Sequence, residues 1–199
     1  MKKPGPFVAL LAAVLCWSAS PASAHPTVVI DAGHGGHDRG GVPGDRYAEK
    51  VCTLDVAQRL QARLREDGYH TVMTRDGDYF VGLGGRCAVA NARRDSIFIC
   101  IHFNSAPREG ANGIETYYYT RQSARFAAAV HSRLVRTAGT PDRHIRTRGY
   151  YVLRNTRVPA VLAECGFLTN RAEGARIAGS AAYRQSLAEA LASAIRSRY

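Results

Sequence analysis

The order of short apolar runs and longer amphipathic segments after residue 24 is the feature that most limits what this chain can fold into. Residues 27–31 form an apolar run rich in β-branched side chains and followed by glycines, which predicts a buried strand that ends in a loop. From Glu49 to about Asp67, apolar residues recur at helical spacing, and Gly68 follows as a stop signal. The same patterns predict strands at 70–75, 96–101, 113–119 and 158–164, and helices at 83–94, 123–137 and 181–198.

This order of elements predicts the fold class. Strands that alternate with helices along the chain form a largely parallel sheet with helices on its faces. The stretch 138–149 is rich in arginine and glycine, and we expect it to be irregular. No internal repeat or low-complexity linker divides the sequence, and 199 residues suit one domain. We therefore expect a single α/β domain that spans residues 25–199.

The first 24 residues have the composition of an export signal. Two lysines precede the apolar run 7–15, and residues 22–24 form the small-x-small site Ala-Ser-Ala. The alternative is a membrane anchor, but the apolar run is shorter than the ~20 residues that a membrane-spanning helix needs. We expect a signal peptide at residues 1–24 that is cleaved before His25. The mature protein would then act in the periplasm, cell envelope or extracellular space, with no membrane span.

The net charge indicates an anionic partner. The whole sequence carries +11, and the two lysines of the signal segment leave +9 (11 − 2) for residues 25–199. A positive surface attracts polyanions. For an exported protein, the nearest polyanions are the phosphates and carboxylates of the cell envelope. We do not expect specific nucleic-acid binding, because no motif that combines aromatic and basic residues occurs.

Four cysteines follow residue 24, and they lack the C-x-x-C spacing of a thiolate zinc site. In an oxidising compartment, four cysteines permit disulfides in three pairings. Cys100 and Cys165 lie in apolar, strand-like runs, where a buried free thiol is at least as reasonable as a bridge. Cys52 and Cys87 lie on expected helices and are candidates for a bridge.

Two histidines and one glutamate are the candidate metal ligands. His34 lies in a glycine-rich loop after the first expected strand, His102 follows another strand, and Glu49 begins a helix. Open α/β sheets place ligand sites beyond the carboxyl ends of their strands, so His34 and His102 can converge. Two imidazoles and one carboxylate are the ligand set of an open catalytic zinc site. Taken singly, the histidines have an alternative as hydrogen-bonded surface groups, and Glu49 as a carboxylate stabilised by the helix dipole.

Glu164 is the candidate catalytic acid and base. It ends the expected strand 158–164 and emerges from apolar residues. Desolvation in such a setting raises the pKa of a carboxyl group toward the working pH, which suits a group that takes and returns a proton. The alternative is an ion pair with one of the many arginines, for example Arg154.

Two other polar residues near the candidate ligands have weaker cases. Asn104 comes two residues after His102, where it can donate a hydrogen bond to a substrate or simply form a turn. His37 can replace His34 as a ligand. However, His37 lies farther from the strand end in a more mobile loop, so we prefer His34.

Five short segments carry further information. They are DAGHGG at 31–36, AEK at 48–50, IHFNS at 101–105, GIETYY at 113–118 and PAVLAECGFLTN at 159–170. Together they resemble the type 3 domain of the zinc-dependent N-acetylmuramoyl-L-alanine amidases of bacterial cell-wall turnover, in order and in spacing, over about residues 27–199. Three positions depart from the family pattern, and none of them is a candidate ligand or Glu164. The departures are Ala32, Cys100 and Cys165.

The resemblance implies a single domain built around a mixed sheet of about six strands. It also implies one zinc ion per chain, held by His34, Glu49 and His102, with Glu164 as the catalytic carboxylate. The implied substrate is peptidoglycan. The implied reaction is hydrolysis of the amide between the lactyl group of N-acetylmuramic acid and L-alanine of the stem peptide, in cell-wall turnover, remodelling or daughter-cell separation.

The resemblance also bears on partners. Some division amidases of this type carry a long helical insertion that covers the zinc until a partner removes it. Here only residues 120–122 separate the expected strand from the next helix. We therefore expect an uncovered site, no obligatory protein activator and a monomer.

Two other functions stay open at this point. A zinc peptidase that cuts within the stem peptide would use the same chemistry, but its products would differ, because an amidase frees intact peptides that begin with L-alanine. A catalytically inactive module that binds the wall or activates another enzyme would lack a ligand or the base. All four residues are present, which argues against such a module.

Overall fold

A computed structural model describes residues 1, 25–41 and 46–199 of the chain. Apart from Met1, the signal peptide expected at residues 1–24 lies outside the described residues. Within the described ranges, no helix has the length and apolar character needed to cross a membrane.

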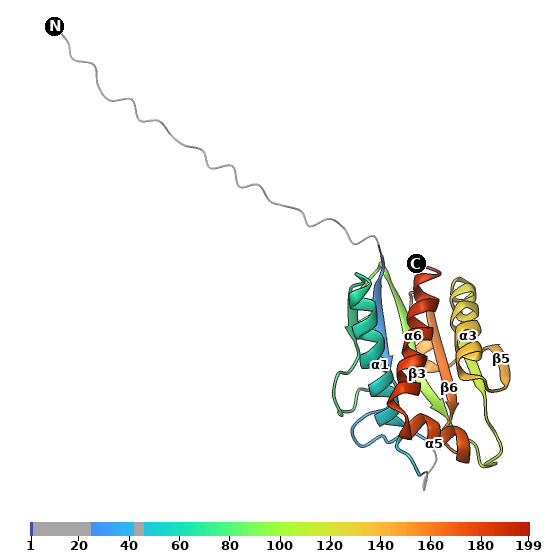
Figure 1. Ribbon diagram of the computed structural model, residues 1–199. Coiled ribbons are helices and arrows are strands. Elements are labelled where there is room, and N and C mark those ends of the chain that lie inside the picture. Colours follow the sequence, from blue (N-terminus) through green and yellow to red (C-terminus); the bar gives the residue numbers. More distant parts are fainter. Residues whose placement is uncertain (2–24, 42–45) are drawn as a thin grey trace.

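The described residues form one six-stranded sheet in the order β2-β1-β3-β6-β4-β5 (Figure 1). Neighbours from β2 to β6 run parallel, β4 is antiparallel to β6, and the edge strand β5 is parallel to β4. This mixed sheet confirms the predicted fold class. The strands are β1 (Thr27–Ala32), β2 (Thr71–Met73), β3 (Ser96–Asn104), β4 (Ile114–Tyr118), β5 (Asp142–Thr147) and β6 (Ala160–Phe167).

Helices cover both faces of the sheet, as predicted. The larger layer, formed by α1, α3, α5 and α6, lies in front of the sheet in Figure 1. The smaller layer, on the other face, consists of α2 and α4. The helices are α1 (Glu49–Glu66), α2 (Leu83–Asn91), α3 (Ala124–Ala138), α4 (Tyr151–Arg154), α5 (Arg171–Gly179) and α6 (Ala181–Arg196), with a 3₁₀ turn η1 (Arg121–Ser123) before α3.

Alternate side chains of the central strands fill two separate cores. Val28 and Ile30 of β1 pack under the larger helical layer, whereas Val29 packs under α2 and α4 together with Phe98 of β3. All four are fully buried. Strands that are buried on both faces have continuous apolar sequences, which is why β1 and β3 were recognisable. Each such side chain contributes about 1.5–3 kcal/mol of burial free energy.

The stretch expected to be irregular contains the strand β5, so that prediction was wrong. Only Ile145 of β5 is an aliphatic residue, and it is half-buried. An edge strand is fixed by backbone hydrogen bonds along one side, and its side chains need no apolar alternation. The short helices α4 and α5 were also not predicted. The Asn170 side chain begins α5 by accepting a hydrogen bond from the Glu173 backbone N–H at 2.9 Å.

Two strands extend farther than predicted. β3 continues to Asn104 and β6 to Phe167, so His102 lies within its strand rather than after it, and Glu164 lies inside its strand rather than at its end. The two residues are direct partners in the parallel register of β3 and β6. At the carboxyl ends of β3 and β6, polar side chains interrupt the apolar pattern that predicts a strand, although the backbone hydrogen bonds continue.

All four described cysteines are free and buried. The bridge considered between Cys52 and Cys87 is absent, and that suggestion was wrong. Cys52 packs in the core beneath α1, whereas Cys87 packs in the core on the opposite face of the sheet. The sheet therefore separates the two thiols.

Candidate metal centre and catalytic pocket

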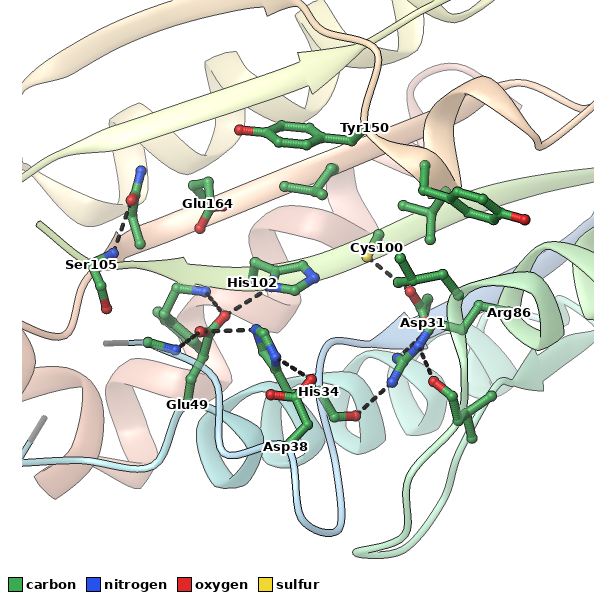
Figure 2. Close-up of a pocket in the computed structure, with 18 of the residues that line it drawn as sticks. Asp31, His34, Asp38, Glu49, Arg86, Cys100, His102, Ser105, Tyr150 and Glu164 are labelled. Atoms are coloured by element: carbon green, nitrogen blue, oxygen red, sulfur yellow. Dashed lines mark hydrogen bonds and ion pairs between the residues drawn. The ribbon is translucent and has the colours of Figure 1, made fainter. Parts of the chain in front are cut away.

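A cavity of about 620 Å³ lies where β1 and β3 approach their carboxyl ends (Figure 2). His34 reaches it from the loop after β1, and Glu49 from the first position of α1. His102 and Glu164 reach it from β3 and β6. This is the position at which an open α/β sheet places a ligand site.

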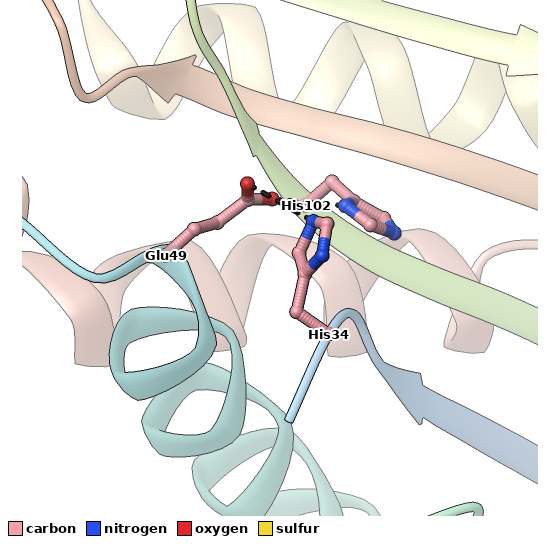
Figure 3. A group of neighbouring side chains, drawn as sticks. All are labelled: His34, Glu49 and His102. Carbon is pink, nitrogen blue, oxygen red and sulfur yellow. Dashed lines mark hydrogen bonds and ion pairs between the residues drawn. The ribbon is translucent and has the colours of Figure 1, made fainter. Parts of the chain in front are cut away.

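The three predicted ligands converge. The shortest approaches are 3.1 Å between His34 Nε2 and Glu49 Oε2, and 2.9 Å between His102 Nδ1 and Glu49 Oε1. One ligand atom from each residue lies within 4.8 Å of the other two, in the arrangement shown in Figure 3. Two nitrogens and one carboxylate oxygen at this spacing suit a metal with three protein ligands and an open position. The structure thus contains a possible metal-binding triad.

Glycines create the space that this triad occupies. A Cβ at Gly33 would stand 2.4 Å from His102 Cε1, so only glycine permits the ring to lie there. Gly40 has a φ of +70°, and a Cβ on it would stand 2.6 Å from Glu49 Oε2. His34 itself has a φ of +62°, which is uncommon for a residue with a side chain. The loop is thus shaped around the ligands at some conformational cost.

Two residues that the sequence did not single out hold His34 in place. Asp38 Oδ2 lies 2.9 Å from His34 Nδ1 and, as a carboxylate, accepts a hydrogen bond from the Nδ1–H group. That bond leaves Nε2 facing Glu49 and free to act as a ligand. The buried Arg86 donates to the His34 carbonyl at 2.7 Å and to Asp31 Oδ1 at 2.8 Å. Asp38 is four residues from His34, but nothing in the sequence distinguishes it from an ordinary loop aspartate.

The triad is electrostatically prepared for a cation. Burial alone would raise the pKa of Glu49, but hydrogen bonds and charge from His102 and His34 outweigh it and hold that pKa at about 2. Burial alone would lower the pKa of His34, but Glu49 and Asp38 outweigh it and raise that pKa. A carboxylate that stays ionised beside two imidazoles is a donor set that a divalent metal can use.

Glu164 lies beside the triad in a different environment. Its Oε2 is buried and has no hydrogen-bond partner among the described residues. Burial raises the pKa of Glu164 well above its usual range, and the charges of Glu49 and Glu115 raise it further. The alternative of an ion pair with Arg154 was wrong, since Arg154 is exposed and makes no ion pair with Glu164. Its carboxyl group therefore faces the cavity without a fixed partner (Figure 2).

Asn104 also lines the cavity, but protein groups already engage its side chain. Its Nδ2 donates to Glu115 Oε2 at 2.7 Å, and its Oδ1 accepts from the Ser105 backbone N–H at 2.8 Å. Glu115, a buried residue that the sequence reasoning missed, also accepts from Tyr117 at 2.7 Å and Arg143 at 3.1 Å. Asn104 keeps one amide proton for a substrate, and its role stays a prediction.

Exposed apolar side chains also line the cavity; they were not predicted, and we call them the apolar wall. It consists of Phe80, Leu83, Tyr150 and Tyr151, which are 49%, 53%, 43% and 44% exposed and all line the cavity. Tyr150 is seen opposite His34 in Figure 2. Exposed apolar side chains gathered at a cavity indicate a ligand surface. His37 lies outside the triad, and its ring packs in a tilted arrangement against Phe80 with ring centres 4.3 Å apart.

Comparison with known proteins gives a family. A family model described as N-acetylmuramoyl-L-alanine amidase matches residues 28–197. Among curated relatives, the N-acetylmuramoyl-L-alanine amidase LytC of Bacillus subtilis is 34% identical over 169 residues. That match covers 83% of this chain but only 34% of LytC, so the chain spans about a third of that relative's length.

Solved structures agree with this match. The catalytic domain of CwlV, an N-acetylmuramoyl-L-alanine amidase from Paenibacillus polymyxa, superposes with a TM-score of 0.82 at 35% identity, covering 86% of this chain and 97% of that one. The amidase CwlD of Clostridioides difficile, solved in complex with the GerS lipoprotein, gives a TM-score of 0.82 at 25% identity, covering 87% and 98%. Each shares the whole described domain rather than a fragment of it.

Proposed function

The chain belongs to the N-acetylmuramoyl-L-alanine amidase family, and we propose that it is a zinc enzyme that cleaves peptidoglycan between N-acetylmuramic acid and L-alanine of the stem peptide. One observation carries the proposal: a compact triad of two histidines and a glutamate beside a buried, unpartnered carboxyl oxygen. A metal site of that kind needs a neighbouring base for hydrolysis, and Glu164, which lines the same cavity, can be that base.

In this proposal His34, Glu49 and His102 hold one zinc ion per chain. When bound, zinc would supply Lewis acidity, which polarises an amide carbonyl and lowers the pKa of water. Asp38 would orient His34 by accepting a hydrogen bond from its Nδ1–H group. The depressed pKa of Glu49 keeps that ligand ionised at every physiological pH.

Glu164 would move the proton. Its Oε2 takes a proton from the attacking water and then delivers it to the nitrogen of the departing L-alanine. Burial raises the pKa of its carboxyl group, which makes the carboxylate a stronger base toward the water proton. The absence of a fixed partner on Oε2 supports this role, since no protein hydrogen bond has to be broken first.

The two sides of the cavity would hold different parts of the substrate. Aromatic side chains present flat apolar faces, which match the apolar face of a pyranose ring. We therefore assign the muramic acid ring to the apolar wall formed by Phe80, Leu83, Tyr150 and Tyr151. The remaining amide proton of Asn104 would donate to the substrate near the scissile amide.

The remaining proposals concern where and with whom the protein acts. The family relatives are cell-wall enzymes, so we propose export by the signal at residues 1–24 and action in the envelope. β4 ends at Tyr118 and α3 begins at Ala124, with only η1 between them. A connection this short holds no long helical insertion that could cover the site, which supports a site that needs no activator. We also propose that the protein is a monomer. CwlD was solved with a lipoprotein partner, which makes the activator question worth testing directly.

The test is a digest of purified peptidoglycan by the mature chain, analysed by mass spectrometry. We expect release of intact stem peptides with a new L-alanine amino terminus, while the glycan strands stay whole. A chelator or the Glu164→Gln substitution should abolish this release. Cuts within the stem peptide would instead establish the peptidase alternative. Binding without any cleavage by the zinc-loaded chain would establish the inactive module, unless a lipoprotein or other partner restores activity.

A further inference from the structure

The positive charge of this chain is concentrated in one quarter of its sequence. Residues 116–163 contain nine arginines, no lysine and one acidic residue, Asp142, which gives a net charge of +8. The whole chain carries +11. This segment runs from β4 through α3, β5 and α4 to β6, so its charge lies at the end of the sheet that β6, β4 and β5 form (Figure 1).

Ion pairs are rarer among the arginines of this segment than among those of α1 and α6. On α1 and α6, every arginine except Arg65 pairs with a carboxylate, for example Arg59 with Asp55 at 2.8 Å and Arg63 with Asp67 at 2.9 Å. In segment 116–163 the described structure pairs only Arg143 with a carboxylate. Seven exposed arginines there make no ion pair with any described residue. One of them, Arg136, donates to the Ser132 hydroxyl on its own helix, and we call the other six the arginine face. They are Arg121, Arg125, Arg146, Arg148, Arg154 and Arg157.

Backbone contacts bring parts of the arginine face together. The Gln122 side chain, next to Arg121, donates to the Arg157 carbonyl at 3.2 Å. The Arg148 backbone N–H donates to the Tyr118 carbonyl at 2.9 Å, which places it at the end of β4 that leads into η1. Arg121, Arg148 and Arg157, far apart in sequence, are thus brought near the connection between β4 and α3.

The arginine face is continuous with the catalytic cavity. The segment from Arg146 to Arg157 also supplies Tyr150 and Tyr151, which form part of the apolar wall. A polymer whose muramic acid ring rests against this wall extends past the cavity on the same segment. Under the proposed function, the polyanion that lies at this cavity is peptidoglycan, whose stem peptides carry free carboxylates.

We infer that the arginine face binds the carboxylates of stem peptides on the peptidoglycan strand outside the cavity. This inference rests on the proposed function, since it takes peptidoglycan as the substrate. Each exposed ion pair contributes little. Several pairs along one polymer act together, because the later contacts form intramolecularly. The surface would therefore hold the enzyme on polymeric wall while contributing little to small fragments.

The experiment measures binding without cleavage. In the Glu164→Gln background, Arg121, Arg148 and Arg157 are replaced by glutamine, and binding to sacculi stripped of attached phosphate polymers is measured by co-sedimentation. The matched control replaces Arg59, Arg63 and Arg196, so that both variants lose three positive charges. A third variant, Arg146→Gln with Arg154→Gln, tests the arginine face at two other positions. Thermal unfolding checks that each variant is folded.

We expect about tenfold weaker binding for the arginine-face variant, as three exposed pairs would give, and less than twofold for the control. The difference should vanish on sacculi whose carboxylates have been amidated. Equal losses in the two triple variants would overturn the inference, because net charge alone would then explain binding. So would a difference that survives amidation. Failure of the amide-cleavage assay would affect the proposed function alone, since binding is measured independently.

Discussion

Glu115 and Glu164 face each other as direct partners in the antiparallel register of β4 and β6. Their surroundings differ. Glu115 accepts hydrogen bonds from Asn104 at 2.7 Å and Arg143 at 3.1 Å, whereas Glu164 Oε2 has no partner in the described structure. Burial raises the pKa of Glu164 well above its usual range, and the charges of Glu49 and Glu115 raise it further. Two glutamates on adjacent strands thus take different roles, one structural and one suited to proton transfer.

Glu164→Gln should abolish most hydrolysis while keeping the fold. General acid–base catalysis contributes a factor of roughly 10²–10⁴, so kcat/KM for peptidoglycan fragments should fall by about that much. Stability in the metal-free protein should change with a defined sign. The folded pKa of Glu164 lies above its unfolded value, so its contribution is fully present below the unfolded pKa and is lost as pH rises through the folded pKa.

The glutamine variant lacks this loss, so its thermal midpoint relative to the wild type should increase from pH 4 to pH 8 in the presence of chelator. A variant that is less stable than the wild type at pH 8 would show that the carboxylate is satisfied in solution. Retained activity would exclude Glu164 as the proton carrier.

The site was predictable to the extent that its residues mark strand ends. In the sequence, His34 and His102 follow expected strands, Glu49 begins an expected helix and Glu164 ends an expected strand, so convergence followed from sheet geometry. Asp38 was not predictable, because an aspartate in a polar loop carries no signal until the fold places it 2.9 Å from His34.

The fold was predictable where side-chain burial sets the sequence. Buried strands such as β1 and β3 show continuous apolar runs, but the edge strand β5 depends on backbone pairing and has a polar sequence. The apolar wall escaped notice for a related reason. Phe80 and Tyr150 are 70 residues apart, and only the packing of α2 and α4 on the same face of the sheet joins them in one cavity.

Asp38→Asn should weaken zinc binding without removing a ligand. The amide can no longer accept the His34 Nδ1 proton as a charged partner, and loss of such a supporting bond typically costs 10- to 100-fold in metal affinity. Competition with a chromophoric chelator measures the affinity. His37→Ala is the control, because that exposed ring stacks on Phe80 outside the triad and its loss should leave zinc affinity unchanged. If the two variants behave alike, Asp38 does not orient the ligand.

Zinc should stabilise the folded protein through Glu49. A ligand present at 100 times its dissociation constant adds about 2.7 kcal/mol to the free energy of unfolding, which corresponds to roughly 5–10 °C for a domain of this size. Differential scanning fluorimetry of chelator-treated protein, with and without added zinc, measures this shift. Glu49→Gln should lose most of the zinc-dependent shift, because it removes the only anionic ligand of the triad. A full shift in that variant would place the metal elsewhere.

Asp55 should give the protein part of its acid sensitivity. Burial tends to raise the pKa of Asp55, but hydrogen bonds from Arg59 and Arg184 outweigh it and lower that pKa. Because the pKa of Asp55 is lower in the folded state, its ion pairs stabilise the protein at pH values above the unfolded pKa of about 3.9. This stabilisation is lost as the pH falls through the folded pKa. Asp55→Asn should therefore cost about 1 kcal/mol at pH 7 and almost nothing near pH 2, measured by urea unfolding. Glu109→Gln, an exposed carboxylate that makes no ion pair with any described residue, is the control and should cost little at either pH.

The apolar wall should act in substrate binding rather than in the chemical step. Tyr150 is 43% exposed, lines the cavity and packs edge-on against Tyr117 with ring centres 5.1 Å apart. Tyr119 is equally exposed at 43% but does not line the cavity, so Tyr119→Ala is a matched control.

Tyr150→Ala should raise KM for a muramyl peptide by roughly 3- to 10-fold, the loss of one ring contact of about 0.5–1.5 kcal/mol, with kcat nearly unchanged. Tyr119→Ala should leave both constants close to those of the wild type. The two constants separate the possible roles, since a ring that merely supports the Glu164 strand would lower kcat instead. A substrate that lacks the sugar provides the deciding comparison. If Tyr150→Ala weakens its binding just as much, the wall contacts the peptide and our assignment of the muramic acid ring is wrong.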